Sequence, residues 1–462
     1  MVATSSAPDK GLDGMTLMRY AQVDRRRDAG GTEQYLGQLN QELLARNRMT
    51  ILQMHLVAGE SPAHSVEIET IGRGRIVWVP VVNRREERSL RSLPRRLTRL
   101  VQNVGAMTPT NSYVNVRRLM RAAYGYVWSP HVVLSEVLGE FLDAYHVDLV
   151  LFHWLSDDIG PLVARATKRR IPYAVIHHFD NHRLSAASSS VWVRDAAAVA
   201  GVSTRNVPRE IQGRYVNVSD AVDADFFSPH RARSVTRPGE FLVLLPSRIV
   251  EGKGHVDLLL ATRRLMDGGA QVSVVCAGAV GSQSLKARLE GMVARCGLAD
   301  RVLFLGRLAS ADLRDWYAAS DVVVLPSNSE GLGRVLLEAQ AMAKPVIAYD
   351  SGGIPDAVLP GESGFLVGAG DIVTLAERME FLRQNPEARG QMGLCGRQFI
   401  IDHFTVQALV ERHEKLYVRL LSGRTSGVGE PETARDHETR GIEQHLAHPR
   451  ASNSCRLNLT GC

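Results

Sequence analysis

The stretch DVVVLPSNSEGLGRVLLEAQAMAKPVIAYDSGGIPD occupies residues 321–356 and has the pattern of a doubly wound α/β domain. A short apolar run ends at Pro326, a loop rich in serine and glycine follows, and helical periodicity comes next. A second apolar run at 344–350 predicts the next strand. The strand–helix–strand order is that of a parallel sheet covered by helices, so this segment predicts an α/β fold.

The loop of this segment is suited to a phosphorylated ligand. Gly331 and Gly333 stand before the predicted helix, where glycine lets a ligand approach backbone N–H groups closely. Those groups and the helix dipole attract a phosphate. Glu330 precedes the helix and Glu338 lies one to two turns inside it, so the two carboxylates need not share a target. One can reach sugar hydroxyls in front of the helix, and the other a ribose beside it.

Similar apolar runs alternate with helical patterns along most of the chain, as in parallel sheets. In the second half the predicted strands are 241–247, 272–278, 301–306, 321–327, 344–350 and 364–368. In the first half they are 15–20, 49–57, 75–82, 147–154, 173–179, 196–203 and 214–218. Two such α/β units joined by a linker predict two doubly wound domains with a ligand cleft between them.

These patterns divide the 462 residues into domains and connecting segments. The first half is predicted as a disordered N-terminus (1–14), a Rossmann-like domain (15–227) with a basic helical insertion at about 83–146, and a linker (228–239). The second half is predicted as a Rossmann-like domain (240–402), an amphipathic helix (403–421) and a disordered tail (422–462).

The composition, with 45% hydrophobic and 23% charged residues, is typical of a soluble globular protein. No run reaches the roughly 18 apolar residues that a membrane-spanning helix needs. The N-terminus lacks the apolar region of a secretory signal, and the five cysteines form no disulfide-like framework. We therefore expect a cytoplasmic protein.

Positive charge gathers between Arg84 and Arg121, where ten arginines and two glutamates give +8, against +6 for the whole chain. One interpretation is a solvated helical face. The other is a surface that meets an anionic membrane, a phosphorylated acceptor or nucleic acid. We expect no nucleic acid, because the block lacks interleaved aromatic residues and any known binding signature. A peripheral position on the inner face of the cell membrane, with a lipid-linked or anionic acceptor, stays open.

Two cations follow the first predicted strand of the second domain. Arg248 stands at its end and Lys253 five residues later, in LLPSRIVEGKGH (244–255). Two cations beside a helix N-terminus can neutralise the charge of a departing diphosphate. The Walker pattern of a phosphate loop is absent from this segment.

Weaker candidates stand near strand ends in the first half. They are Gly30, Gly31 and Glu33 in the turn of DAGGTEQYLGQL (28–39), His153 at the end of one strand, and His177 and His178 in HHFDNH (177–182). A lone histidine is more often structural than functional. The histidine cluster lacks the HExxH spacing of zinc sites, so acceptor contact and packing are its alternatives.

The segment SEGLGRVLLEAQAMAKPVIAYDSGGIPD resembles the signature of family-four (group 1) retaining glycosyltransferases of the GT-B fold. The resemblance implies two Rossmann-like domains facing each other across a cleft, with a UDP- or GDP-sugar as donor. By this resemblance Glu330 would bind hydroxyls of the donor sugar, and Glu338 the nucleotide ribose. Arg248 and Lys253 match the family's cations for the leaving diphosphate.

The resemblance assigns roles to further residues. The backbone of Gly333, Arg334 and Val335, after Gly331 and Leu332, would hold the distal phosphate. Gly306 and Arg307 would read the base. In the first domain, the turn with Gly30, Gly31 and Glu33 would touch phosphate or acceptor, His153 would face the donor sugar, and His177 and His178 would lie near the acceptor.

Two segments outside the cleft also resemble the family. The final helix, with Phe404 and Tyr417, resembles the one that crosses back onto the first domain. RYVNVSDAVDADFFSP (214–229) resembles the crossover NGVDxxxFxP, although Asp220 and Ala221 replace the usual asparagine and glycine. We take this departure to concern the turn more than the chemistry.

The resemblance also implies a mechanism without a metal or other cofactor. The acidic pair Asp223 and Asp225 falls in the crossover, and no other DxD pair follows a strand. No carboxylate is placed for a covalent intermediate, so same-face attack with retention is implied. The acceptor is open between envelope or exopolysaccharide glycans and a secondary metabolite. Alternative functions on the same fold are a nucleotide-sugar 2-epimerase, a phosphorylase and a catalytically idle scaffold.

Overall fold

The computed structural model describes part of the chain, namely residues 12–23, 31–57, 67–82, 142, 145–153, 160–179, 181, 184, 191–236 and 241–422. Most of the predicted insertion (83–146) and the tail from 423 lie outside these residues. The same holds for Gly30 and residues 1–11. The predictions made for those segments stay predictions.

The first domain is built on an eight-stranded sheet with the order β3-β4-β2-β1-β5-β6-β7-β8. Its strands are β1 (Thr16–Val23), β2 (Thr50–Val57), β3 (Glu67–Ile71), β4 (Gly74–Val82), β5 (Leu149–His153), β6 (Tyr173–His177), β7 (Ala198–Gly201) and β8 (Tyr215–Asn217). Neighbouring strands pair in parallel except β3 and β4, which form an antiparallel hairpin. The sequence analysis missed β3, because this edge strand is polar and its Ile68 is 61% exposed.

The second domain is built on a six-stranded parallel sheet with the order β11-β10-β9-β12-β13-β14. Its strands are β9 (Phe241–Leu245), β10 (Val272–Ala277), β11 (Val302–Gly306), β12 (Val322–Leu325), β13 (Val346–Tyr349) and β14 (Gly364–Val367). The strand order reverses between β9 and β12, and ligands of doubly wound sheets bind at such a reversal. Arg248 and Lys253 follow β9, and Glu330 follows β12.

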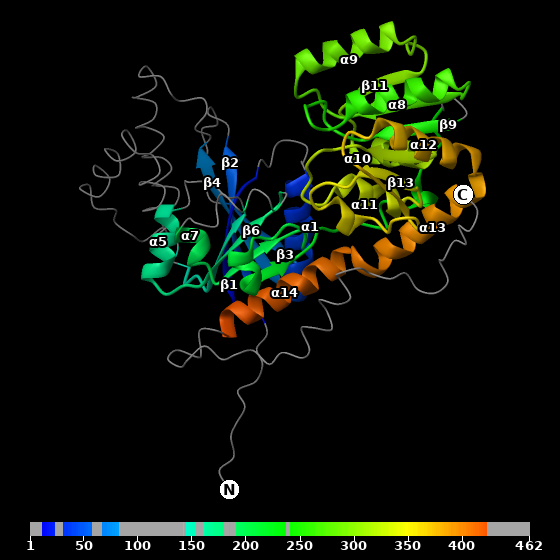
Figure 1. Ribbon diagram of the computed structural model, residues 1–462. Coiled ribbons are helices and arrows are strands. Elements are labelled where there is room, and N and C mark those ends of the chain that lie inside the picture. Colours follow the sequence, from blue (N-terminus) through cyan, green and yellow to red (C-terminus); the bar gives the residue numbers. More distant parts are fainter. Residues whose placement is uncertain are drawn as a thin grey trace.

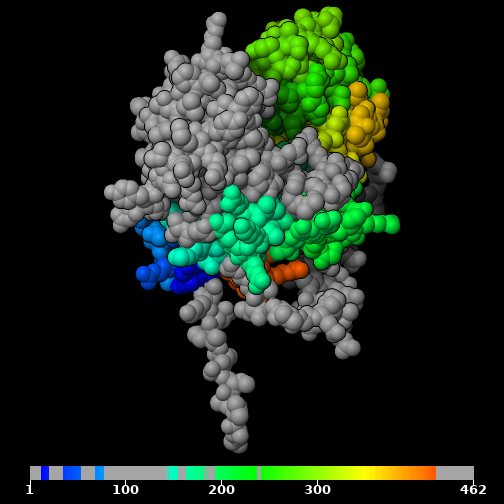
Figure 2. Space-filling view, turned by 90° about the vertical axis from the view of Figure 1, so that its left-hand side faces the viewer, coloured from blue at the N-terminus to red at the C-terminus, as the bar shows by residue number. Residues whose placement is uncertain are grey.

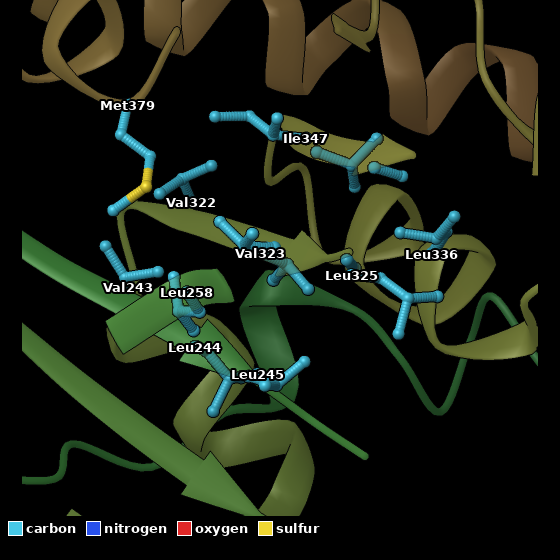
Figure 3. Packing of buried hydrophobic residues seen from close by; sticks show 14 of the residues in the cluster. Val243, Leu244, Leu245, Leu258, Val322, Val323, Leu325, Leu336, Ile347 and Met379 are labelled. Carbon is cyan, nitrogen blue, oxygen red and sulfur yellow. The ribbon is translucent and has the colours of Figure 1, made fainter. Parts of the chain in front are cut away.

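The helices cover both sheets, as Figure 1 shows. They are α1 (Gly31–Arg46), α5 (Gly160–Lys168), α7 (Val191–Arg194), α8 (His255–Asp267), α9 (Gln283–Arg295), α10 (Ser310–Ala319), α11 (Arg334–Ala341), α12 (Ile372–Gln384), α13 (Pro386–His403) and α14 (Val406–Ser422). In the second domain Leu258 of α8 and Met379 of α12 pack with Val243 and Val322 of the central strands (Figure 3). Every residue of β9 and β12 is buried, as expected for strands covered on both faces.

The two domains form the GT-B fold and face each other across a cleft. In the space-filling view the green and yellow residues of the second domain lie above the cyan and blue residues of the first (Figure 2). The chain crosses from one domain to the other twice, near Val222 and near Phe404. The two crossing segments lie side by side, and the backbone N–H of Val222 donates to the carbonyl of Phe404 at 2.9 Å. Val222 also bridges to Thr405.

The last helix corrects one expected boundary. Helix α13 runs to His403, so α14 begins at Val406 rather than at residue 403. Phe404, between the two helices, packs in the core of the second domain, whereas Tyr417 of α14 packs in the core of the first. Helix α14 thus crosses back and lies against α1 and β5 (Figure 1).

Candidate active site

A cavity of about 570 Å³ lies between the two domains. Its volume is within the range of sites for small ligands. The wall from the second domain contains seven of the predicted site residues, namely Arg248, Lys253, Glu330, Gly331, Leu332, Gly333 and Arg334. The wall from the first domain contains Tyr35, His178, Phe179, Val202 and Asp220.

Lys253 and Glu330 form an ion pair at this wall. Lys253 Nζ lies 2.5 Å from Glu330 Oε1, and each side chain is about one fifth exposed. Their approach depends on Gly254, whose φ of +71° and tight packing exclude a side chain: a Cβ there would lie 2.0 Å from the carbonyl oxygen of Pro326. The loop after β9 therefore packs directly on the end of β12, which brings the lysine to the glutamate.

Arg248 is exposed at the same wall, and among the described residues no carboxylate forms an ion pair with it. Across the wall, Gly333 caps the N-terminus of α11 with φ +89°. The first N–H groups of a helix have no partner inside the helix and are available to an anion. Arg248, Lys253 and the N-terminus of α11 therefore stand on one wall and can meet a single ligand.

Arg334 connects the two domains. Its Nη1 donates to Asp220 Oδ1 at 3.2 Å and its Nη2 donates to Gln38 Oε1 at 3.0 Å, both in the first domain. Burial raises the pKa of Asp220, and Arg334 opposes that shift. The sequence analysis assigned the departure at Asp220 to the turn, but the structure shows that this carboxylate lines the cavity and pairs with Arg334. The sequence signal for this ion pair was the aspartate at position 220, where the crossover pattern has an asparagine.

Glu338 lies behind Arg334 and outside the cavity wall. Tyr317 donates to its Oε2 at 2.8 Å, and Arg334 Nε lies 3.5 Å from its Oε1. Burial raises the pKa of this carboxyl, with Arg334 and Tyr317 opposing the shift. The ribose contact that the sequence predicts for Glu338 stays a prediction.

The histidines occupy different positions from those expected. His178 lines the cavity, whereas His153 is fully buried behind it, with its Nδ1 3.0 Å from His178 Nε2. Burial lowers the pKa of both rings, to about 3 for His178, so both are neutral near pH 7. His177 is also buried, beside the ring of Tyr215. The structure thus places His178, rather than His153, at the wall.

The other predicted residues lie outside the cavity wall. Gly306 and Arg307 stand at the end of β11, which is the edge strand of the second sheet. Val335 follows Arg334 in α11, and its carbonyl accepts from the Tyr317 hydroxyl at 3.3 Å. Gly31 opens α1 and Glu33 lies in its first turn. The base-reading and phosphate-loop roles of these residues stay predictions.

The domains touch at one edge of the cavity through glycines. A Cβ on Gly331 would lie 2.4 Å from the carbonyl oxygen of His178, and one on Gly353 would lie 2.6 Å from the Cβ of Ser203, both in the first domain. Next to them, Asp356 of the second domain accepts hydrogen bonds from the Ser203 hydroxyl and the Thr204 N–H, both at 2.8 Å. A side chain at either glycine would hold the domains apart.

The described residues contain neither a metal-binding cluster nor a membrane-spanning helix. No group of three or more histidine, cysteine, aspartate or glutamate side chains there is arranged to hold a metal ion. No described helix is both long and apolar enough to cross a membrane.

Comparison with known proteins identifies the family. The family model for glycosyl transferases group 1 matches residues 227–399. A D-inositol 3-phosphate glycosyltransferase of Streptomyces avermitilis is 31% identical over 280 residues, which cover 54% of this chain and 60% of that protein. A GDP-mannose-dependent alpha-(1-6)-phosphatidylinositol monomannoside mannosyltransferase of Mycolicibacterium smegmatis is 30% identical over 292 residues, 58% of this chain and 73% of that protein. The chain belongs to the group 1 glycosyltransferases.

The chain spans about three fifths of the length of the D-inositol 3-phosphate glycosyltransferases that it matches. Solved structures of the same fold cover more of the chain. A glycosyltransferase of Rickettsia africae has a TM-score of 0.62 at 17% identity, over 88% of this chain and 98% of its own. Anabaena HepE, solved with UDP and glucose, has a TM-score of 0.59 at 18% identity, over 87% and 99%. At these identities the likeness shows the GT-B fold.

Proposed function

We propose that this chain transfers a sugar from a UDP- or GDP-sugar to an acceptor with retention of the anomeric configuration. The observation that carries the proposal is the Lys253–Glu330 ion pair at 2.5 Å, beside Arg248 and the N-terminus of α11. These groups converge on one cavity and match the charge that a leaving nucleoside diphosphate develops.

The ion pair suits a ligand that carries both negative charge and hydroxyl groups. A diphosphate attracts Lys253 and frees an oxygen of Glu330, which then accepts a hydrogen bond from a sugar hydroxyl. Without ligand the two side chains neutralise each other, so neither is left as an isolated half-buried charge. Arg248 adds a second cation, which exposure leaves free to move toward the diphosphate.

The carboxylates of the wall support retention without a covalent intermediate. Asp220 is held by Arg334, Glu330 is occupied by a sugar hydroxyl when the donor is bound, and the third carboxylate of the wall, Glu251, is exposed. A carboxylate that is already held by a cation or a hydroxyl is a weaker nucleophile, so attack by the acceptor on the face of the departing phosphate is favoured. A phosphate oxygen then accepts the acceptor's proton, and no metal ion is needed because two side-chain cations stabilise the charge.

The names of two relatives support an anionic acceptor. One name contains inositol 3-phosphate and the other a phosphatidylinositol mannoside. We propose an acceptor that bears phosphate, either free or lipid-linked, as in cell-envelope glycan synthesis. Such an enzyme would work in the cytoplasm or at the inner face of the membrane.

A donor screen tests the proposal. UDP-, GDP- and ADP-sugars are added to the protein, and the thermal midpoint is measured; a ligand at 100 times its Kd adds about 2.7 kcal/mol. We expect a rise with one nucleotide class, followed by slow release of that nucleotide into water. Conversion to the C2 epimer indicates the epimerase, and binding without any turnover indicates the scaffold.

A further inference from the structure

A chain of buried polar side chains leads from the first sheet through α14 to the cavity. It begins at Arg19 of β1, which is fully buried. Arg19 donates from Nη1 to Asn40 Oδ1 and from Nη2 to the Tyr417 hydroxyl, the latter at 3.1 Å. In the part of the chain that the structure describes, Arg19 forms no ion pair with a carboxylate. Its charge therefore acts on the neutral groups around it.

The chemistry of arginine sets the direction of the first hydrogen bond in this chain. A guanidinium has donors and no acceptor, so the oxygen of Tyr417 accepts from Arg19. The Tyr417 oxygen has a second lone pair, but a proton on His413 Nδ1 would leave the fully buried Tyr417 hydroxyl proton without an acceptor among the described residues. The Tyr417 proton is therefore directed to His413 Nδ1, 3.0 Å away. Burial and the nearby charge of Arg19 lower the pKa of His413 well below its usual value, so this ring is neutral. A neutral imidazole that accepts at Nδ1 carries its proton on Nε2.

The chain ends at Tyr35 of α1. His413 Nε2 lies 2.5 Å from the Tyr35 hydroxyl oxygen, which must accept this hydrogen bond. The hydroxyl proton of Tyr35 is thereby left for another acceptor, and among the described residues His413 is its one hydrogen-bond partner. Burial raises the pKa of Tyr35 well above 10, so the proton stays on the oxygen near neutral pH.

Tyr35 lies at the cavity. It forms part of the cavity wall although the residue is only 1% exposed. Its ring meets the ring of His178 edge-on, at 4.8 Å between centroids, and His178 lies on the same wall. These residues belong to the first domain, opposite Arg248, Lys253 and Glu330. A ligand group that meets Tyr35 is therefore on the side of the cavity away from the diphosphate.

We propose that the Tyr35 hydroxyl donates a hydrogen bond to an oxygen of the acceptor, and that Arg19, Tyr417 and His413 are positioning residues that leave its proton free to do so. The inference rests on the proposed function of the cavity. It also gives α14 a role in the site: the helix comes from the second domain, packs on α1 and supplies both His413 and Tyr417 (Figure 1).

The first experiment reads the direction of the chain without any substrate. In the ¹⁵N spectrum of histidine-labelled wild-type protein at pH 7, His413 is expected as the neutral tautomer with its proton on Nε2. Tyr417→Phe removes the donor to Nδ1 and should abolish this preference. A proton on His413 Nδ1 in the wild type overturns the inference.

The second experiment measures transfer from UDP-glucose and GDP-mannose to two probes, D-inositol 3-phosphate and phosphatidylinositol vesicles. Tyr35→Phe should lower kcat/KM for the acceptor about 10- to 100-fold, because one hydrogen bond to a charged or polar group is lost. The Kd for UDP or GDP should stay within about twofold, since the nucleotide contacts lie on the other wall. His413→Leu should behave like Tyr35→Phe, and His413→Gln, which can still accept and donate, should recover part of the rate.

Tyr173→Phe is the matched control, because Tyr173 is a buried tyrosine of the same domain that does not line the cavity. Acceptor kinetics of Tyr35→Phe equal to those of Tyr173→Phe would overturn the inference alone. Equal losses in acceptor kinetics and nucleotide binding would also overturn it, because they indicate a merely structural role. A wild-type protein that neither binds nor hydrolyses a nucleotide sugar would overturn the proposed function first, and the inference with it.

Discussion

The two walls of the cavity are built in different ways. The wall of the second domain presents charged side chains that are partly exposed and paired with each other, such as Lys253 and Glu330. Apart from Asp220, which pairs with Arg334, the wall of the first domain presents neutral polar groups, Tyr35 and His178, that are held by other buried side chains. An ion pair can exchange partners when a charged ligand arrives, whereas a buried network fixes orientation before any ligand arrives. The first arrangement suits charge stabilisation and the second suits positioning.

The largest expected effect lies on the charged wall. Lys253→Ala should lower turnover of the nucleotide sugar by about 10²–10³-fold, the usual effect of removing one group that stabilises developing charge. The thermal midpoint should stay near that of the wild type, because the side chain is partly exposed. Turnover is measured as nucleotide release, with Lys415→Ala, at an exposed position of α14, as the control. A rate near that of the wild type would remove Lys253 from the proposed mechanism.

The next effect tests the contact between the walls. Gly331→Ala should lower kcat about 10- to 100-fold, because its Cβ would lie 2.4 Å from the His178 carbonyl oxygen and misplace the two walls. Gly390→Ala in α13 is the control, since a Cβ there meets nothing within 4 Å. If both variants have the wild-type kcat, the domains do not need this close approach.

The third effect concerns pH and the buried wall. The pKa of His178 is about 3 in the folded protein, against about 6.5 unfolded. Between these values the unfolded chain binds a proton that the folded chain does not, so stability falls as pH falls from 6.5 towards 3. The contribution of His178 is at most about 1.4 kcal/mol per pH unit. Urea midpoints at pH 7 and 5.5 should differ more for the wild type than for His178→Gln; equal differences would contradict the neutral state of His178.

The smallest expected effect concerns the link between the walls. Asp220→Asn keeps the shape of the side chain and removes its charge, so the hydrogen bond from Arg334 weakens. We expect a loss of about 1 kcal/mol in the free energy of unfolding, because a hydrogen bond to a charged group contributes about 1.5–3 kcal/mol and the amide oxygen of asparagine keeps part of it. Thermal unfolding of this variant is compared with that of Asp225→Asn at an exposed position of the same crossover. Equal midpoints would show that the Arg334 link adds no stability.

The charged wall could be predicted from the sequence, and the buried wall largely could not. Arg248, Lys253 and Glu330 stand in short segments that follow predicted strands, so local pattern alone brings them to one edge of a sheet. Tyr35 and His413 are 378 positions apart, and no local signal connects them. A histidine at a strand end, such as His153, gives no sign from sequence whether it faces a cavity or the core.

The same contrast holds for the fold. Strands of the second domain agree with the predicted runs within a few residues, because buried parallel strands are apolar throughout. The edge strand β3 was missed because its pairing depends on β4 more than on its own apolar content. The start of α14 was misplaced by three residues because helical periodicity continues from α13 through Phe404.

Proton NMR of a reaction mixture tests the central claim most directly, since the anomeric signal reports both cleavage and configuration. With a UDP- or GDP-sugar and D-inositol 3-phosphate as the probe acceptor, the account predicts loss of the donor signal. A product signal of the same anomeric configuration should appear in the wild type and be nearly absent in Lys253→Ala. An inverted product, a C2 epimer of the donor, or a product formed equally fast by Lys253→Ala would contradict the account.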